Sequence, residues 1–239
     1  MIERVRQSDL AGRIVVATTT DDDDDVIQIL CKQDGIHCFR GERDDCLDRH
    51  YQTALFFNAE AVVKIPSDCP LIDPQIIDKT ISCFLETPGE YDFVSNLHPP
   101  SYPDGNDVEV MRMDALERAW NEAKRPFERE HTTPYFWENP DKFSIANVSW
   151  ETGLDYSMTH RWTIDYQDDF DFINTVYEKL YPSNPAFGLQ DILDLLEAEP
   201  EIADINAKYS GVNWYRHHLD ELTTVSDEQT RSPFEDESE

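Results

Sequence analysis

The sequence has no long apolar run and no closely spaced pair of cysteines. Nothing in its 239 residues approaches the ~18 apolar residues of a membrane-spanning helix, and no apolar stretch follows a basic start as in a signal peptide. The five cysteines are odd in number and never form C-x-x-C, which argues against a disulfide framework or a four-cysteine zinc site. We therefore expect free thiols and a cytoplasmic protein.

Lysine is also scarce. Seven lysines and 13 arginines stand against 50 acidic residues, and the formal net charge is −30. Such a field repels nucleic acid and anionic membranes, so neither is expected as a partner. An acidic, lysine-poor surface is typical of proteins in a high-salt cytoplasm, where screening removes self-repulsion. The run Asp21 to Asp25 could imitate a metal-binding cluster, but it is interpreted as a solvated loop or helix start.

Short β-branched runs alternate with segments of helical periodicity. Strands are predicted at 14–18, 36–41, 61–65, 91–95, 108–111, 143–148 and 161–165, and helices at 26–30, 47–58, 74–85, 114–123, 128–138, 170–180 and 189–196. This alternation predicts an α/β protein with a mostly parallel sheet and helices on both faces. We expect one domain over 1–206, a packing segment over 207–222, and a disordered acidic tail over 223–239.

Two aspartates follow predicted strands. Asp68 comes after "AVVKIPS", and Asp165 closes "HRWTI". Either could simply be a turn or helix-capping residue. Ligands gather beyond the carboxyl ends of strands in α/β sheets, however, and two carboxylates at one such edge could share a divalent cation. Mg²⁺ prefers one or two carboxylates with waters and phosphate oxygens. The residues therefore predict a Mg²⁺–nucleotide site.

Six motifs carry a family resemblance: "RGERDDCLDRHY", "IPSDCPLIDP", "YDFVSN", "YPDGNDVEV", "EREHTTPYF" and "HRWTIDYQDDFDF". Over residues 1–206, their order and wording resemble the spore-coat polysaccharide cytidylyltransferases, relatives of the CMP-KDO and CMP-sialate synthetases. The resemblance implies a Rossmann-like nucleotide-diphospho-sugar transferase fold. It also implies that a sugar hydroxyl attacks the α-phosphorus of CTP, releasing pyrophosphate and leaving a CMP-sugar. A homodimer is implied as well.

The resemblance assigns roles to particular residues. It implies that Asp68 and Asp165 are catalytic ligands of Mg²⁺ or Mn²⁺. It further implies nucleotide contacts from Asp48, Arg49 and Ser67, and substrate contacts from Asp104, Asp107, Glu109, Arg129, Glu130, His131 and Arg161. Plainer interpretations stay open, because Arg49 could be a surface residue, His131 structural, and "YPDGNDVEV" a turn with solvated acids. Arg161 could meet a substrate carboxylate or phosphate bidentately.

The sequence departs from the family pattern in two places. Tyr166-Gln167 stands where the family usually has Thr-Pro. The family also opens with a strand and a Gly-rich, basic loop that cradles the CTP phosphates, and "MIERVRQSDL" resembles the helix after that loop. We expect this chain to lack that first strand. Two hypotheses follow: an active transferase with a start upstream of Met1, or a non-catalytic homologue that binds a sugar, a nucleotide or a partner protein.

Overall fold

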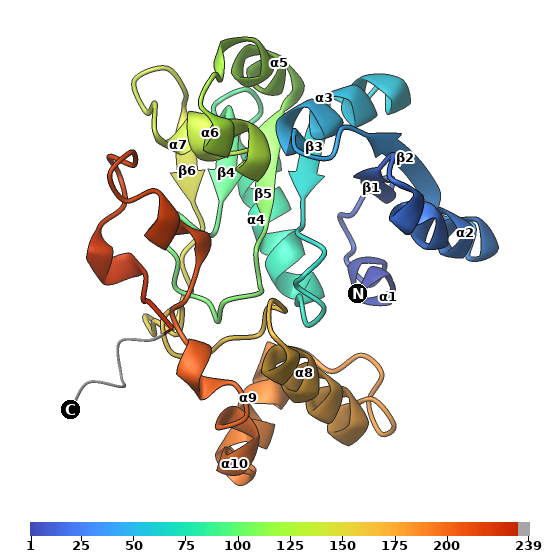
Figure 1. Cartoon of the computed structure of the whole chain (residues 1–239), viewed down its shortest axis with the longest axis vertical. Helices are drawn as coiled ribbons and strands as arrows, with labels where there is room; N and C mark the ends of the chain where they lie inside the picture. The colour runs from blue at the N-terminus through green and yellow to red at the C-terminus, as the bar shows by residue number, and fades with distance from the viewer. Residues whose placement is uncertain (234–239) are drawn as a thin grey trace.

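The strands of this protein form two separate sheets in the computed structural model, which describes residues 1–233 (Figure 1). One sheet pairs β1 (Val15–Thr19) with β2 (His37–Gly41) in parallel. The other has the order β3 (Ala61–Lys64), β5 (Glu109–Arg112), β4 (Phe93–Ser95), β6 (Ile145–Asn147). In the second sheet β5 runs antiparallel to both of its neighbours, and β4 and β6 are parallel. The α/β class is confirmed, but the pairing is more mixed than the sequence predicted.

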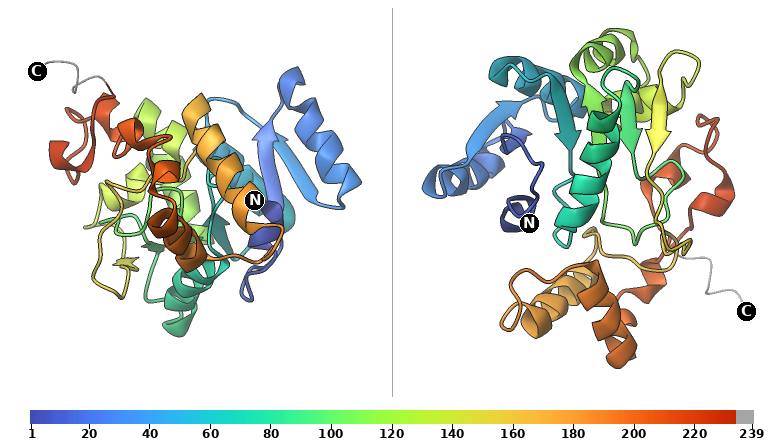
Figure 2. Two further views of the ribbon diagram at one scale, coloured as in Figure 1. Left: turned by 90° about the horizontal axis from the view of Figure 1, so that it is seen from below. Right: turned by 180° about the vertical axis from the view of Figure 1, so that it is seen from behind.

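Helices cover both faces of the four-stranded sheet. Their bounds are α1 (Ile2–Val5), α2 (Asp25–Gln33), α3 (Cys46–Phe57), α4 (Pro74–Glu86), α5 (Met113–Glu122), α6 (Pro126–His131), α7 (Pro134–Trp137), α8 (Gln167–Leu180), α9 (Leu189–Ala198) and α10 (Pro200–Ala203). Because side chains alternate along a strand, Phe93 and Met111 pack in one core cluster, with α3, α5 and α6, while Val94 and Val110 pack with α4. Figure 2 shows α4 on the face opposite α6 and α7 of Figure 1.

The start of α4 illustrates how local sequence sets an element. Asp73 caps the helix by accepting a hydrogen bond from the backbone N–H of Gln75 at 2.7 Å, and Pro74 occupies the first helical position. The second carboxylate oxygen of Asp73 accepts from the backbone N–H of Leu189 at 2.5 Å. One side chain therefore ends a loop, begins α4 and joins it to α9.

Two predicted elements differ from the structure. Segment 161–165 is not a strand, because its ladder is limited to one bridge between Arg161 and Asp104. The helix predicted over 128–138 is broken into α6 and α7 at Thr132, which has a φ of 73°. Pro134 lies two residues further on and is the first residue of α7, where its missing N–H is tolerated but could not continue the ladder of a preceding helix.

The C-terminal segment is more ordered than the sequence predicted. It contains the 3₁₀ turns η2 (Ala207–Tyr209), η3 (Trp214–His217) and η4 (Asp227–Gln229). One further 3₁₀ turn, η1 (Asp22–Asp24), lies near the N-terminus, in the run of aspartates 21–25. The backbone N–H and hydroxyl groups of Thr223 and Thr224 donate to the Glu138 carboxylate at 2.6–2.9 Å. The prediction of disorder is therefore wrong for 223–233, and 234–239 lie outside the described residues.

Over residues 1–233, none of the helices has the length and apolar character to cross a membrane.

Gly105 is required where the chain passes close to another segment. Its φ is +100°, and a Cβ built on it would lie 2.6 Å from the backbone carbon of Trp162. Gly105→Ala should therefore lower the free energy of unfolding by about 2–4 kcal/mol, measured by urea denaturation. Gly89→Ala, at a φ of +80° with open space around it, is the matched control and should cost about 1 kcal/mol. Equal losses would show that the close approach to Trp162 is unimportant.

Candidate active site

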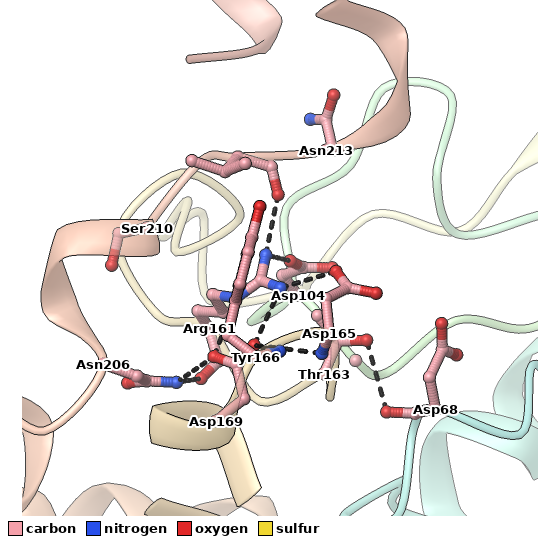
Figure 3. A network of polar contacts seen from close by, with 12 residues as sticks. Asp68, Asp104, Arg161, Thr163, Asp165, Tyr166, Asp169, Asn206, Ser210 and Asn213 are labelled. Carbon is pink, nitrogen blue, oxygen red and sulfur yellow. Dashed lines mark hydrogen bonds and ion pairs between the residues drawn. The ribbon is translucent and has the colours of Figure 1, made fainter. Parts of the chain in front are cut away.

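Segment 160–165 lies between two loops, and the three stretches bring their carboxylates together (Figure 3). The backbone N–H of Ile164 and the Thr163 hydroxyl both donate to the Asp68 carbonyl, at 3.0 and 3.2 Å. On the other side, Trp162 N–H donates to the Asp104 carbonyl at 2.8 Å. The structure thereby places Asp68, Asp104 and Asp165 near one another, with Asp107 three residues beyond Asp104. We call these four residues the carboxylate cluster.

The charges of the carboxylate cluster act on one another. Burial and the charge of Asp165 raise the pKa of Asp68. Burial and the charge of Asp107 raise the pKa of Asp104 well above its usual range. Burial and the charge of Asp68 raise the pKa of Asp107 to about 7. Such repulsion is relieved by a cation, so the cluster is electrostatically suited to hold one.

The cluster fits Mg²⁺ only as part of a shared coordination sphere. Carboxylate oxygens are the hard ligands that this ion prefers. Within the described part of the chain, however, no three His, Cys, Asp or Glu side chains are grouped so that they could hold a metal ion. Mg²⁺ is characteristically bound by one or two carboxylates, with waters and substrate phosphates completing six ligands. The donor set therefore suits an ion that arrives with a nucleotide.

The guanidinium of Arg161 is buried and hydrogen-bonded to other residues of this protein. The residue is 2% exposed, and its guanidinium donates to both oxygens of Asp169 at 2.9 and 3.0 Å. It also donates to Asp165 at 2.6 Å and to the Val212 carbonyl at 2.7 Å. Asp104 lies 3.7 Å away. The geometry makes Arg161 the residue that positions Asp165, which differs from the substrate contact suggested by the family resemblance.

A second buried ion pair adjoins the carboxylate cluster. Lys64 ends β3 directly opposite Glu109 in the register with β5, and their charged atoms are 2.5 Å apart. The side chains are only 17% and 2% exposed. Burial opposes the charged form of each residue, but the charge and the hydrogen bond of the partner together exceed it, so the pKa of Lys64 is raised and that of Glu109 is lowered. Sequence analysis missed Lys64, although a lysine within an apolar strand was an available signal.

Two histidines beside this ion pair are stacked on tryptophans. His131 lies on Trp214 with ring centroids 3.8 Å apart, and His98 lies on Trp137 at 4.4 Å. Burial lowers the pKa of both histidines to about 4, so both are neutral at pH 7. Trp214 belongs to η3, and the C-terminal segment therefore forms part of this region. His131, which the family resemblance implies as a substrate contact, lies near this ion pair and is held in place by stacking on Trp214.

Other residues implied by the resemblance have structural contacts. Arg129 binds Asp45 at 2.5 and 2.9 Å, and Asp48 accepts from the Trp120 indole at 2.8 Å. Arg49 donates to the backbone carbonyl oxygens of residues 42 and 43. Ser67 and Glu130 are exposed. A hollow of about 400 Å³ lies beside Arg129, lined also by Trp120, Asn121, Ala123 and Lys124. Nucleotide contacts from Asp48, Arg49 and Ser67 stay predictions.

The raised pKa of Asp107 should make stability depend on pH. Because its pKa moves from 3.8 to about 7 on folding, the protonated carboxyl favours the folded state, and that contribution is lost as pH rises from about 4 to 7. Asp107→Asn should remove about 1–3 kcal/mol of this decline, measured by urea unfolding at several pH values. Asp141→Asn, at an exposed position on a surface turn, is the control. Parallel curves for wild type and Asp107→Asn would contradict the assignment.

Comparisons with known proteins identify the family of this chain. The family model described as "Cytidylyltransferase" matches residues 1–188. The chain therefore belongs to the cytidylyltransferase family. It is 31% identical to an uncharacterized protein of Methanocaldococcus jannaschii over 216 residues, covering 87% of this chain and 82% of that protein.

Two further relatives are informative. The chain is 25% identical to the spore coat polysaccharide biosynthesis protein SpsF of Bacillus subtilis, covering 85% of this chain and 84% of that protein. The solved structure of a cytidylyltransferase from Leptospira borgpetersenii matches with a TM-score of 0.79 and 29% identity, covering 85% of this chain and 83% of that one. Both the suspected family and its Rossmann-like α/β fold are confirmed.

Proposed function

We propose that this protein transfers a cytidylyl group from CTP to a sugar hydroxyl. The hydroxyl oxygen forms a bond to the α-phosphorus, the bond between the α-phosphorus and the bridging oxygen to the β-phosphorus breaks, and pyrophosphate leaves. A CMP-sugar results, and the hydroxyl proton passes to solvent or a cluster carboxylate. The observation that carries this proposal is the carboxylate cluster, in which Asp165 lies near enough to Asp68 for its charge to raise the pKa of Asp68, although their sequence numbers differ by 97.

Asp68 and Asp165 are the residues that would hold Mg²⁺ together with the CTP phosphates. The bound ion would neutralise negative charge that grows on the phosphates during transfer. Arg161 keeps Asp165 in place through its hydrogen bond, and segment 163–164 fixes the Asp68 backbone. The protein's own contribution is therefore positioning and electrostatic complementarity, which account for most of the catalysis of phosphoryl transfer.

The biological setting that we propose is the activation of a sugar for a surface polysaccharide, in the cytoplasm. The relationship to SpsF, whose name refers to spore coat polysaccharide, supports this role. A homodimer is part of the proposal, supported by the exposed apolar side chains Val26, Ile29 and Leu30 on α2 and by Phe56 on α3.

Turnover and binding should be measured together. We expect pyrophosphate release that requires CTP, a sugar and Mg²⁺, and that is weaker with UTP. Calorimetry should show that CTP binds more tightly with Mg²⁺ than with EDTA. Mg²⁺ with CTP should also flatten the pH dependence of stability, because the bound cation lowers the raised carboxyl pKa values. Mg²⁺-dependent CTP binding without pyrophosphate release from any sugar would favour the alternative, a nucleotide-binding protein without turnover.

A further inference from the structure

Two of the five free cysteines lie in neighbouring elements, Cys31 near the end of α2 and Cys38 near the start of β2. We propose that they form a dithiol which a hydroperoxide converts into a disulfide, fastening α2 to β2 reversibly. Neither thiol takes part in the proposed cytidylyl transfer, so the inference does not depend on that function.

The turn between α2 and β2 brings the two cysteines together. It consists of residues 34–36, so the helix and the strand run in opposite directions and the end of α2 lies beside the start of β2 (Figure 2). The backbone N–H of Ile36 donates to the Cys31 carbonyl at 2.8 Å, which closes the turn against the last residues of the helix. The helix also packs on the strand. Cys31 is therefore opposite the first residues of β2.

The alternation of side chains along β2 directs Cys38 towards α2. Cys38 and Arg40 share one face of the strand, and the Arg40 guanidinium donates to Asp25 of α2 at 2.5 Å. Phe39 points the opposite way, with its ring centroid 5.9 Å from that of Phe56 on α3. The face of β2 that carries Cys38 is therefore the face that α2 covers.

The two thiols are close enough to interact. Cys31 is the buried residue of α2, with 3% of its surface exposed, and its thiol shares a hydrogen bond with that of Cys38. Burial, and after it the neighbouring Cys31, raise the pKa of Cys38. The thiolate is the nucleophile in thiol chemistry, so oxidation should be slow near pH 7 and faster under mildly alkaline conditions.

Solvent has a route to this dithiol. A hollow of about 550 Å³ lies where α2 ends and β2 begins. Its lining comes from these two elements and the turn between them: Gln28, Ile29, Lys32, Ile36, His37 and Cys38. Cys38 is half-buried, whereas Cys31 is buried. Cys38 is therefore the thiol that meets the peroxide, and Cys31 is the thiol that resolves the product.

The reaction takes place in two steps. The Cys38 sulfur takes one oxygen from the peroxide, the oxygen–oxygen bond breaks, and a sulfenic acid and one water result. The Cys31 sulfur then bonds to the Cys38 sulfur, and the hydroxyl group leaves with the Cys31 proton as a second water. The two thiols lose two electrons and hydrogen peroxide gains them. Dithiothreitol reverses the reaction by thiol–disulfide exchange.

The other three cysteines have different surroundings. Cys46 accepts a hydrogen bond from Arg49 at 2.9 Å, and the Cys69 thiol donates to Asp68 at 3.5 Å. Cys83 is half-buried on α4, as Cys38 is on β2, and provides a matched control. We therefore expect peroxide to join Cys31 to Cys38 and to form no other pair.

Peptide mapping tests this expectation on the full chain. The protein is treated with hydrogen peroxide at mildly alkaline pH, its remaining thiols are blocked with N-ethylmaleimide in denaturant, and it is digested without reductant. Trypsin cleaves after Lys32, so the disulfide would hold peptides 14–32 and 33–40 together. We expect this joined pair as the main product, and its loss on treatment with dithiothreitol. Five blocked thiols, a bond to another cysteine, or a sulfinic acid at Cys38 would overturn the inference.

Three variants sharpen the assignment. Cys83→Ser should give the joined peptides in wild-type yield, and Cys38→Ser should give none. Cys31→Ser removes the resolving thiol, so dimedone should label the sulfenic acid that persists at Cys38. If Cys31→Ser does not fold, the wild-type map and Cys38→Ser decide the question. A disulfide-linked product that persists unchanged in Cys38→Ser would contradict the pairing.

Hydrogen exchange measures whether the bond fastens α2. The β1–β2 sheet shares no ladder with the four-stranded sheet within the described residues, so α2 and β2 can open without breaking that larger sheet. In the oxidised protein, amide exchange over residues 25–41 should slow by at least about tenfold, because the cross-link restricts the open state. Cys83→Ser treated in the same way should show the same slowing. Equal exchange in the oxidised and reduced proteins would refute the fastening.

Discussion

Asp68→Asn should reduce Mg²⁺-dependent pyrophosphate release by at least about 100-fold, because it removes a negative oxygen ligand from the proposed metal–nucleotide site. Asp165→Asn should have a comparable effect. Turnover is measured at saturating CTP and sugar, with calorimetric titration of Mg²⁺–CTP alongside. Asp141→Asn, exposed and distant from the cluster in sequence, should retain wild-type turnover.

The stability of Asp68→Asn should not fall with its activity. The pKa of Asp68 is raised on folding by burial and by Asp165, so the ionised carboxylate at pH 7 disfavours the folded state. Removing that charge should leave the free energy of unfolding unchanged or higher by about 1 kcal/mol. Lost activity together with retained stability is typical of a functional residue. Undiminished turnover in either asparagine variant would refute the metal assignment.

Arg161→Met should lower the free energy of unfolding by about 3–5 kcal/mol, the cost of removing one partner from a buried ion pair. Asp169, which is fully buried, would keep backbone donors at Asp165 and Tyr166 and the amide of Asn206. It would nevertheless lose the two guanidinium bonds that balance its charge. Asp165 would lose its positioning contact, and we expect turnover to fall as well.

Urea denaturation followed by circular dichroism tests this second prediction. Arg43→Met is the matched control, because Arg43 pairs with Asp21 at 2.9 Å but is 71% exposed. Exposed pairs contribute about 0–1 kcal/mol. Arg161→Lys keeps the charge without the planar fork and should fall between the two. A loss below about 1 kcal/mol for Arg161→Met would show that the pair's desolvation cost cancels its attraction.

Local sequence signals predicted several elements correctly. The apolar periodicity of 74–85 and the Asp73-Pro74 start gave α4, because capping and proline geometry act within a few residues. The β-branched run at 61–65 gave β3, and Asp68 does follow it. Segment 161–165 was mispredicted as a strand because its apolar residues are buried between two loops rather than in a ladder. Pattern alone does not distinguish these two environments.

By itself, the sequence determined the cytidylyltransferase family, the α/β class and the pair of aspartates that follow strand-like segments. These properties can be recognised from short motifs, their order along the chain, and short-range periodicity. Only the tertiary structure decided which charged groups are paired within the protein. Lys64 is paired with Glu109 through the register of β3 and β5. Arg161 is paired with Asp165 and Asp169, and Trp214 of the C-terminal segment stacks on His131. Such partnerships join distant positions, and they are settled by burial and geometry, which no single stretch of sequence encodes.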